Sequence, residues 1–380
     1  MHITIERTAL LGALTHAQSV VEKRTTIPIL ANVMLDAGGD RLSLTATDMD
    51  LTLEEVVAAS CHKDGIITLE AHIFYEVIKK LPDGVQVELR LDEDSGQCIV
   101  SAGASEFRLP TLPAEDFPAI RNTDLPEPMQ IDVSVVRELI ERTRFAISME
   151  ETRYYLNGIF LLTYEDEQGK KGLRAVATDG HRLSKCDIEV STLQDSISGV
   201  IVPRKAVLEI HKAIEGMEGV LGLAVSQTRI QMQVGDMCMT SKLIDGTFPD
   251  YNRVIPKKNP HALSLDPKAF SKAVDRVTVV SSERSKGVRL NLEEGSEMQM
   301  QSSSTDRGLA QEKLSVSYEA PPIQIGFNAR YLGDVLEQLS GPEVTFWLVD
   351  SSSPVIVEEQ SQINDTFASA LTFVLMPMRV

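Results

Sequence analysis

Apolar residues recur along this chain in blocks of helical and of strand spacing. In the first third, Leu10, Leu14 and Ala17 share one face of a helix predicted over 6–21, and a second helix is predicted over 71–81. The blocks between and after these helices alternate apolar with polar residues or are β-branched, which is typical of half-buried antiparallel strands. The strands predicted in this third are 29–35, 42–47, 51–58, 85–91, 97–102 and 106–109.

The same order of helix, strands, helix, strands returns twice. The second cycle begins with a helix from Ser134, and the third runs from Leu263 to Val380. Pro-rich polar segments at 121–128 and 253–260 separate the cycles. In the second cycle we predict strands over 155–164 and 172–178 and a helix over 204–214. This pattern predicts an α+β fold in which sheets are backed by helices, used three times. The predicted domains are 1–122, 129–251 and 252–380.

A short motif supports the threefold repeat. Thr-Asp pairs occur at 47–48, 178–179 and 305–306, which are spaced by 131 and then 127 residues. About 20 residues after each pair, a predicted strand runs into a predicted helix; these segments are 68–78, 201–210 and 326–336. Because the flanking segments repeat in the same order, the repeat is the size of a domain.

The net charge restricts the classes of partner. The chain has 37 Lys and Arg against 55 Asp and Glu, a formal charge of −18. An ordinary nucleic-acid binder gains its affinity by neutralising phosphates, so any DNA contact here is expected to be local or topological. Lys268, Lys272 and Arg276 are spaced by four and line one face of a predicted helix. This stripe is either a solvated face or part of a positive surface.

The C-terminal segment is unusually apolar for the end of a chain. Residues 374–380 are apolar at every position but one, Arg379. The segment either packs as a last strand or forms a wall of an apolar cleft, and methionine is common at surfaces that accept several partners. That property favours the cleft for Met376 and Met378.

An enzyme was weighed against these patterns. Asp179 and His181 could form a metal pair or an acid–base couple, but no third ligand is near them in sequence. The four cysteines form no Cys-x-x-Cys pair, and there is no phosphate loop, Gly-x-Ser-x-Gly elbow or dinucleotide fingerprint. No catalytic residue, metal or cofactor is therefore predicted. No apolar run approaches a membrane span and no secretion signal begins the chain, so we expect a soluble, cytoplasmic protein.

Five motifs, taken in order, resemble one bacterial family over the full length of the chain. They are TyrTyrLeuAsnGly (154–158), ThrAspGlyHisArgLeu (178–183), PheProAspTyr followed by ArgVal (248–254), GlyValArgLeu (287–290) and MetProMetArg (376–379). The family is the bacterial DNA polymerase III beta subunit, the replicative sliding clamp.

The resemblance implies both a fold and a function. The fold is the DNA clamp: three repeated domains, in a head-to-tail homodimer that closes a ring of six domains with helices lining the hole and sheets outside. The function is that of a non-catalytic processivity factor, which encircles duplex DNA and tethers the replicative polymerase. Its partners would be replicative and translesion DNA polymerases, the clamp loader, and other replication and repair proteins, docked through short peptides between domains 2 and 3.

The resemblance also implies positions for the functional residues. The expected peptide-binding residues are Tyr155, Leu156, Thr178, Gly180, His181, Arg182, Leu183, Pro249, Arg253, Val254, Asn328, Tyr331, Val374, Met376, Pro377, Met378 and Arg379. The DNA-facing residues that the resemblance implies are Arg24, Tyr154 and Lys205, with the departing positions His72 and Glu150, and the helical stripe of Lys268, Lys272 and Arg276 described above is expected to face DNA as well. The chain departs from the family at His72, Glu150 and Pro354, where Arg, Gln and often Ser are expected.

Within this interpretation, the two ends of the subunit form the dimer contact. Strands near 97–109 of the first domain are expected to meet 277–280 and 298–315 of the third. Two alternatives remain at this stage: a metal-dependent hydrolase using Asp179 and His181, and a non-replicative scaffold built on the clamp fold.

Overall fold

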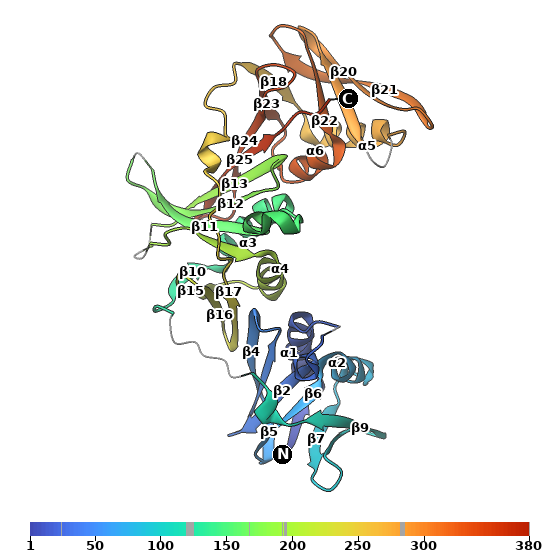
Figure 1. Cartoon of the computed structure of the whole chain (residues 1–380), viewed down its shortest axis with the longest axis vertical. Coiled ribbons are helices and arrows are strands. Elements are labelled where there is room, and N and C mark those ends of the chain that lie inside the picture. Colours follow the sequence, from blue (N-terminus) through green and yellow to red (C-terminus); the bar gives the residue numbers. More distant parts are fainter. Residues whose placement is uncertain are drawn as a thin grey trace. The chain divides into compact units, whose positions relative to one another are not determined.

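The fold is described in a computed structural model that covers residues 1–23, 25–118, 125–166, 168–191, 193, 196–281 and 286–379. The chain divides into two compact units (Figure 1). Unit 1 comprises Met1–Val133 and Lys205–Leu243, and unit 2 comprises Ser134–Arg204 and Ile244–Val380. The middle third of the sequence therefore contributes to both units. The predicted domain ends at 122 and 380 and the predicted DNA contact at Arg24 lie outside the described residues.

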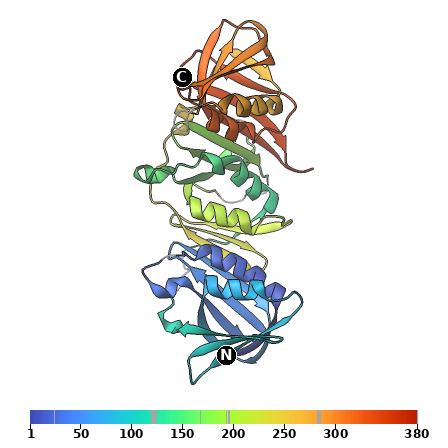
Figure 2. The same ribbon diagram turned by 90° about the vertical axis from the view of Figure 1, so that its right-hand side faces the viewer.

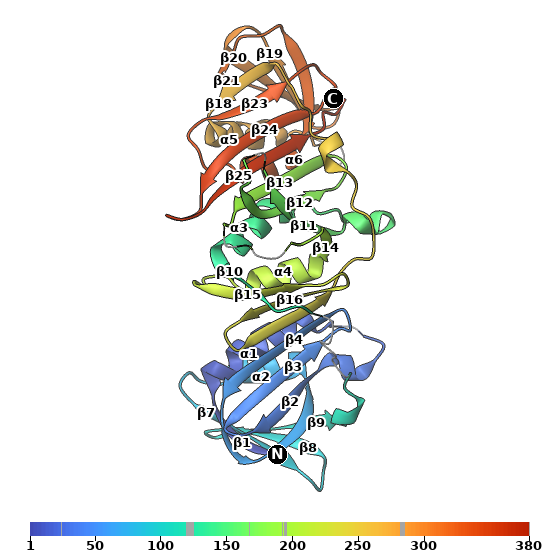
Figure 3. The same ribbon diagram turned by 90° about the vertical axis from the view of Figure 1, so that its left-hand side faces the viewer.

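Unit 1 is built on a sheet of thirteen strands, all paired antiparallel, in the order β10-β15-β16-β17-β4-β3-β2-β6-β9-β8-β7-β1-β5. Figure 3 shows β2, β3 and β4 side by side. Its strands are β1 (His2–Glu6), β2 (Asn32–Gly38), β3 (Arg41–Thr47), β4 (Leu51–Ala58), β5 (Ser60–Lys63), β6 (Gly65–Glu70), β7 (Gln86–Asp92), β8 (Gln97–Ala102), β9 (Ser105–Leu112), β10 (Met129–Asp132), β15 (Val220–Val225), β16 (Arg229–Val234) and β17 (Met237–Lys242).

Unit 2 contains a twelve-stranded antiparallel sheet in the order β14-β11-β12-β13-β25-β24-β23-β18-β21-β20-β19-β22. The pairing of β13 with β25 joins the middle third of the sequence to its last strand, from Arg182 opposite Leu375 to Ile188 opposite Ser369. Its strands are β11 (Gly158–Glu165), β12 (Lys171–Thr178), β13 (Arg182–Glu189), β14 (Val200–Pro203), β18 (His261–Leu265), β19 (Gly287–Leu292), β20 (Gly295–Ser304), β21 (Gly308–Tyr318), β22 (Ile323–Asn328), β23 (Val344–Leu348), β24 (Val355–Gln362) and β25 (Ala368–Leu375).

Six α-helices lie in the described part of the chain, two for each predicted cycle. They are α1 (Arg7–Val20), α2 (Ala71–Lys80), α3 (Val133–Thr143), α4 (Arg204–Ala213), α5 (Pro267–Thr278) and α6 (Ala329–Leu336). Leu10, Leu14 and Ala17 bury the predicted apolar face of α1. Figure 2 shows α1 and α2 lying against each other on unit 1. Each of α2, α4 and α6 directly follows a strand, as the repeat predicts.

The first two Thr-Asp pairs form the same turn, bond for bond. In the second copy, the Thr178 hydroxyl donates to the carbonyl of Arg182 (2.7 Å) and accepts from the backbone N–H of Gly180 (3.1 Å). One oxygen of Asp179 accepts from the next two backbone N–H groups, those of His181 and Arg182. Thr47 and Asp48 make the same four bonds in the first copy. Short side chains that bond local backbone in this way explain why this dipeptide repeats.

The third copy and the starts of two predicted strands differ from expectation. The strand predicted over 29–35 begins only at Asn32, because Pro28–Ala31 form a 3-10 helix. The third pair lies in a tight hairpin between β20 and β21, where Ser304 pairs with Gly308. The strand predicted over 155–164 begins only at Gly158, because 151–156 form a short 3-10 helix closed by the bond from the Asn157 N–H to the Tyr154 carbonyl (3.0 Å). None of the helices in the described ranges is long and apolar enough to cross a membrane.

Candidate functional site

The residues predicted to bind a peptide all lie in unit 2. They come from the 3-10 helix Glu151–Leu156, the Thr178–Leu183 turn, the segment 249–254, the junction of β22 with α6, and the chain end from Val374 in β25 onward. One apolar cluster underlies three of these elements and consists of Leu156, Val176, Leu183, Ile201, Phe248, Tyr251 and Val374. The structure therefore brings the turn, the 249–254 segment and the last strand together around a shared core.

The predicted apolar floor separates into a buried layer and an accessible layer. Leu183 and Val374 are each 1% exposed and Leu156 is 4% exposed, so these side chains belong to the core and support the site from below. Accessible apolar surface is offered by Val254 at 45% and Met376 at 37%. Tyr155, Pro377 and Met378 are half-buried, and Pro249 is exposed.

The chain end packs as a strand and then continues as a short segment held by backbone bonds. Residues up to Leu375 pair with β13 and β24 as the last strand. Beyond the strand, the Met376 N–H donates to the His181 carbonyl (2.9 Å), and the Met378 N–H donates to the Gly326 carbonyl (2.8 Å). The segment 376–379 is thus an extended tail fixed along the Thr178–Leu183 turn. We refer to it below as the tail.

Arg182 is buried, with 6% of its side chain exposed. Its Nε donates to Asp179 (3.2 Å), one terminal nitrogen donates to Asp334 of α6, and the other donates to the Phe145 carbonyl (2.6 Å). The guanidinium carbon also lies 5.2 Å from the Phe145 ring centre and 4.5 Å from that of Tyr331. Each of its three nitrogens thus donates to a protein group and only 6% of the side chain is exposed, which leaves Arg182 little surface to act as the peptide donor expected from the sequence.

His181 is the exposed side chain of the turn, and its ring stacks on Tyr331 with centres 5.9 Å apart. Burial and the nearby Asp179 charge raise the pKa of Tyr331, so its hydroxyl is a neutral donor at physiological pH. Asn328, also predicted to touch a peptide, caps α6 through its side-chain oxygen, which accepts from the Arg330 N–H (3.0 Å).

These contacts also concern the alternative in which Asp179 and His181 bind a metal ion. Both carboxylate oxygens of Asp179 accept hydrogen bonds from its own turn, through the backbone N–H groups of His181 and Arg182 and the Arg182 Nε. The His181 ring is placed against Tyr331. Among the described residues, no group of three His, Cys, Asp or Glu side chains is arranged to hold a metal ion.

The segment 249–254 is anchored by aromatic packing. The Phe248 and Phe160 rings stack with centres 4.8 Å apart and planes within 2°. The Tyr251 hydroxyl accepts from Arg174 (3.2 Å), and Arg174 also forms a two-pronged bond with Asp187. This anchoring leaves Arg253 and Val254 at the surface. Arg253 pairs with Asp250, three residues earlier (3.0 Å), and 85% of its side chain is exposed, so it remains accessible to a ligand.

The predicted DNA-facing side chains differ in whether they already pair with other groups of the protein. Lys268 and Lys272 are exposed on α5, and no described carboxylate lies within ion-pair distance of either. Arg276 forms a two-pronged bond with Glu312. Lys205 donates to Asp48 and to the Val20 carbonyl (2.8 Å), which holds α4 against the first Thr-Asp turn within unit 1. Lys205 is therefore already committed within the protein.

The other predicted DNA contacts are mixed. Tyr154 is 54% exposed. Glu150 pairs with Arg153 (3.1 Å). His72 bonds Gln18 through Nδ1, while its buried Nε2 has no hydrogen-bond partner among the residues that the structure describes. Pro354, noted as a departure from the family, is half-buried and accepts from Asn259 through its carbonyl (2.9 Å).

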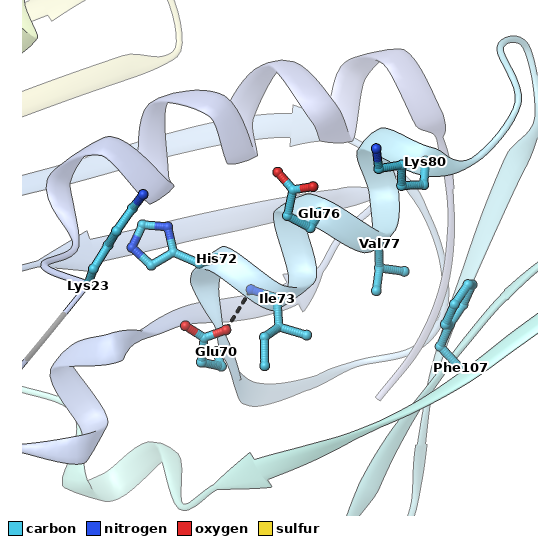
Figure 4. Close-up of a pocket in the computed structure, with 8 residues that line it drawn as sticks. All are labelled: Lys23, Glu70, His72, Ile73, Glu76, Val77, Lys80 and Phe107. Carbon is cyan, nitrogen blue, oxygen red and sulfur yellow. Dashed lines mark hydrogen bonds between the residues drawn. The ribbon is translucent and has the colours of Figure 1, made fainter.

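A second surface feature lies on unit 1 (Figure 4). A pocket of about 600 Å³ runs along the outer face of α2 and is lined by Lys23, Glu70, His72, Ile73, Glu76, Val77, Lys80 and Phe107. Ile73 is 56% exposed, and Phe107 comes from β9. An apolar helix face left open in this way is typical of a contact surface.

Sequence reasoning missed the two residues outside the turn that bond Arg182. Asp334 and Phe145 hold Arg182, yet neither lies in a recognised motif. A buried arginine predicts that partners exist, but their identity depends on which elements pack together. In the sequence they lie 152 and 37 residues from Arg182, so no local signal indicates them.

All three thirds of the chain match one protein family. Residues 1–121 match the family described as the N-terminal domain of the DNA polymerase III beta subunit, residues 130–250 match its central domain, and residues 252–379 match its C-terminal domain. The chain is 45% identical over 380 residues to the beta sliding clamp of Caulobacter vibrioides, with 100% of both chains covered. It is 35% identical over 381 residues to that of Escherichia coli K12, again with 100% of both covered.

Solved structures agree with these relatives. The chain is similar to the beta sliding clamp of Caulobacter crescentus with PEG bound to a putative beta-motif tethering region, with a TM-score of 0.95, 45% identity, and coverage of 100% of this chain and 99% of that chain. It is also similar to the sliding clamp of Bartonella birtlesii bound to griselimycin, with a TM-score of 0.93, 40% identity and 100% of both chains covered.

Proposed function

The chain belongs to the family of the DNA polymerase III beta subunit, the beta sliding clamp, and from this membership we infer its function. It is a DNA sliding clamp: a non-catalytic processivity factor built from three clamp domains, with a site for partner peptides. The observation that carries this conclusion is the match of all three domains, in order, over the whole chain.

We propose that partner peptides bind on unit 2 between the Thr178–Leu183 turn and the tail. Val254, Met376 and the half-buried Met378 offer apolar surface, while His181, Arg253 and Tyr331 offer polar atoms that would orient an extended peptide. A few polar groups around apolar surface is the usual composition of a binding groove. Burying two or three large apolar side chains at about 1.5–3 kcal/mol each, less the ordering cost, gives an affinity on the order of micromolar.

Griselimycin is a suitable probe of this site, because clamps of Bartonella birtlesii and Pseudomonas aeruginosa have been solved bound to it. In fluorescence anisotropy, a labelled short apolar peptide should bind the chain, and griselimycin should displace it. A peptide that stays bound at saturating griselimycin, with unchanged affinity in Met376→Ala and Val254→Asp variants, would place peptide binding elsewhere.

We propose that retention on DNA is topological and that direct contact is weak. The overall charge of −18 opposes binding to phosphates, whereas Lys268 and Lys272 provide a local positive stripe on α5. Binding to linear duplex should therefore be feeble and steeply dependent on salt. Protein loaded on a closed circle should leave once the circle is cut, and equal retention before and after cutting would refute the topological part.

The open face of α2 is the proposed dimer contact in the ring. Counted from the first helical residue, Ile73 and Glu76 of α2 correspond to Ala206 and Glu209 of α4, and both of those are buried at the junction with the first Thr-Asp turn. On α2 the matching positions remain open and line the pocket of Figure 4. The occupant would be the third domain of a second copy, whose β20–β21 hairpin carries Asp306, Arg307 and the 57% exposed Leu309.

The mass in solution tests this contact, since a closed ring requires a dimer at micromolar concentration. A mass that stays monomeric on concentration would refute it. Finer parts of the proposal are a cytoplasmic location, domain boundaries at 1–122, 129–251 and 252–380, and partners that include polymerases, the clamp loader and repair proteins. Loss of processive synthesis on removal of the protein would separate this function from that of a non-replicative scaffold.

A further inference from the structure

The Arg182 side chain connects α6 to the turn that carries His181. We propose that Asp334 and Arg182 are positioning residues of the peptide site: through their bond they fix His181 and Tyr331 without touching the peptide. The inference rests on the proposed peptide site described above. It assigns a function to Asp334, which is remote in sequence from every motif of that site.

The burial of Arg182 shows that its bonds are not incidental. With 6% of its side chain exposed, the guanidinium depends on protein partners, because a buried charge without a partner is strongly destabilising. Its three nitrogens each bond a different segment, namely the turn itself through Asp179, α6 through Asp334, and the stretch after α3 through the Phe145 carbonyl. A planar fork of this kind fixes direction as well as distance.

The first copy of the turn shows that the arginine is not needed to form the turn. There, Leu51 occupies the position of Arg182, and all four hydrogen bonds of the turn are nonetheless present. Met49 even adopts the left-handed conformation (φ 80°) that Gly180 adopts in the second copy (φ 87°). The arginine side chain therefore serves contacts outside the turn, among them the bond to Asp334 and the contact with the Tyr331 ring, both in α6.

The segments that Arg182 joins are those that present the peptide-binding groups. Tyr331 lies one turn of α6 before Asp334, with its ring facing the guanidinium on one side and stacked on His181. The His181 carbonyl holds the tail through Met376, and Gly326, just before α6, holds it through Met378. The turn thus contacts α6 through Arg182 and the tail through His181, and the tail contacts the strand before α6 through Gly326. Releasing Asp334 would let α6 and the turn separate, so that His181 and Tyr331 lose their common position.

The test compares Asp334→Asn with Glu337→Gln, a matched loss of one negative charge on an exposed residue at the end of the same helix. Binding of griselimycin and of the labelled apolar peptide is measured by anisotropy and calorimetry. Asp334→Asn should weaken both about tenfold, a typical coupling between linked groups, while Glu337→Gln leaves them unchanged. The NMR signal of the His181 ring, assigned with His181→Gln, should shift in Asp334→Asn because the Tyr331 ring moves.

A route through Arg182 predicts non-additivity. In an Arg182→Lys background, where the three-way fork is lost but the charge is kept, adding Asp334→Asn should cause no further loss of affinity. Equal affinity of wild type, Asp334→Asn and Arg182→Lys, or additive losses in the double variant, would overturn the inference. If Asp334→Asn does not fold, the comparison of Arg182→Lys with wild type decides alone. Absence of binding by the wild type would instead refute the proposed peptide site.

Discussion

Removing the tail separates its role in binding from its role in folding. Deletion of Met376 to Val380 leaves β25 complete, because its pairing with β13 and β24 ends at Leu375. Among the described residues, the backbone bonds lost are those from Met376 to His181 and from Met378 to Gly326. At about 0.5–1.5 kcal/mol each, their loss costs about 1–3 kcal/mol. A domain stable by about 5–15 kcal/mol remains folded after such a loss.

The effect on peptide binding should be larger. Full burial of a methionine side chain is worth about 1.5–3 kcal/mol, and a peptide would cover each of the two methionines in part, so together they supply about 2–4 kcal/mol of binding free energy. Since 1.4 kcal/mol is tenfold, affinity should fall about 30- to 1000-fold, from micromolar to barely measurable. The double variant Met376→Ala/Met378→Ala keeps the backbone bonds and should lose most of this affinity, which separates side-chain contacts from the position of the tail.

The assay is a titration of labelled peptide beside a light-scattering mass and a thermal unfolding curve for each variant. The expected result is a folded dimer that no longer binds peptide. Unchanged peptide affinity would place the peptide site away from the tail. Collapse to an unfolded monomer would mean that the tail belongs to the core, contrary to the partial exposure of Met376 and Met378.

Three further predictions concern charge, pH and assembly. Lys205→Ala should destabilise unit 1 by about 1–2 kcal/mol, because Asp48 loses its charged partner. Lys268→Ala should leave stability unchanged and reduce the slope of log affinity for DNA against log salt by about 0.9. Similar effects of both variants on stability would contradict this distinction. The hydrogen bond to Glu55, with the charges of Glu55 and Glu209, raises the pKa of His16 despite burial. Protonated His16 therefore stabilises the fold fully below pH about 6.5, and this contribution is lost as pH rises through the raised pKa. The thermal stability of wild type should fall over this pH range more than that of His16→Gln, and parallel pH profiles of the two proteins would refute this. Ile73→Asp on α2 should yield a monomer, whereas Ile66→Asp, at a similarly exposed site on β6, should remain dimeric; a dimeric Ile73→Asp by light scattering would exclude α2 from the interface.

Much of the fold could be predicted because its determinants are local. The spacing of Leu10, Leu14 and Ala17 gives α1, and the strand-to-helix repeats locate α2, α4 and α6. What could not be predicted is long-range pairing. Nothing in the sequences of β17 and β4, or of β13 and β25, indicates that these strands pair, because an antiparallel ladder is formed by backbone groups that every residue carries.

For the proposed peptide site, the sequence indicates which segments come together but not which individual contacts they make. The composition of the tail indicated a cleft wall, and the structure places Met376 against the His181 turn. Burial reversed the interpretation of individual side chains, since Leu183 and Val374 support the site from the core and Arg182 binds protein groups. A pattern of residue types indicates which segments are apolar, but the side chain that remains accessible depends on packing around it.

The two intact Thr-Asp turns show how one local structure serves two purposes. In both copies the turn pairs with a helix of the same unit. Asp48 of the first turn pairs with Lys205 of α4, and Arg182 of the second turn pairs with Asp334 of α6. The turn thus supplies the negative charge in the first copy and the positive charge in the second. In the first copy the contact ends there, since Asp50 at the position of His181 pairs with Lys242. In the second copy, His181 stacks on Tyr331 and its carbonyl binds the tail. Both turns therefore hold neighbouring parts of the chain together, and the second turn also carries groups of the proposed peptide site.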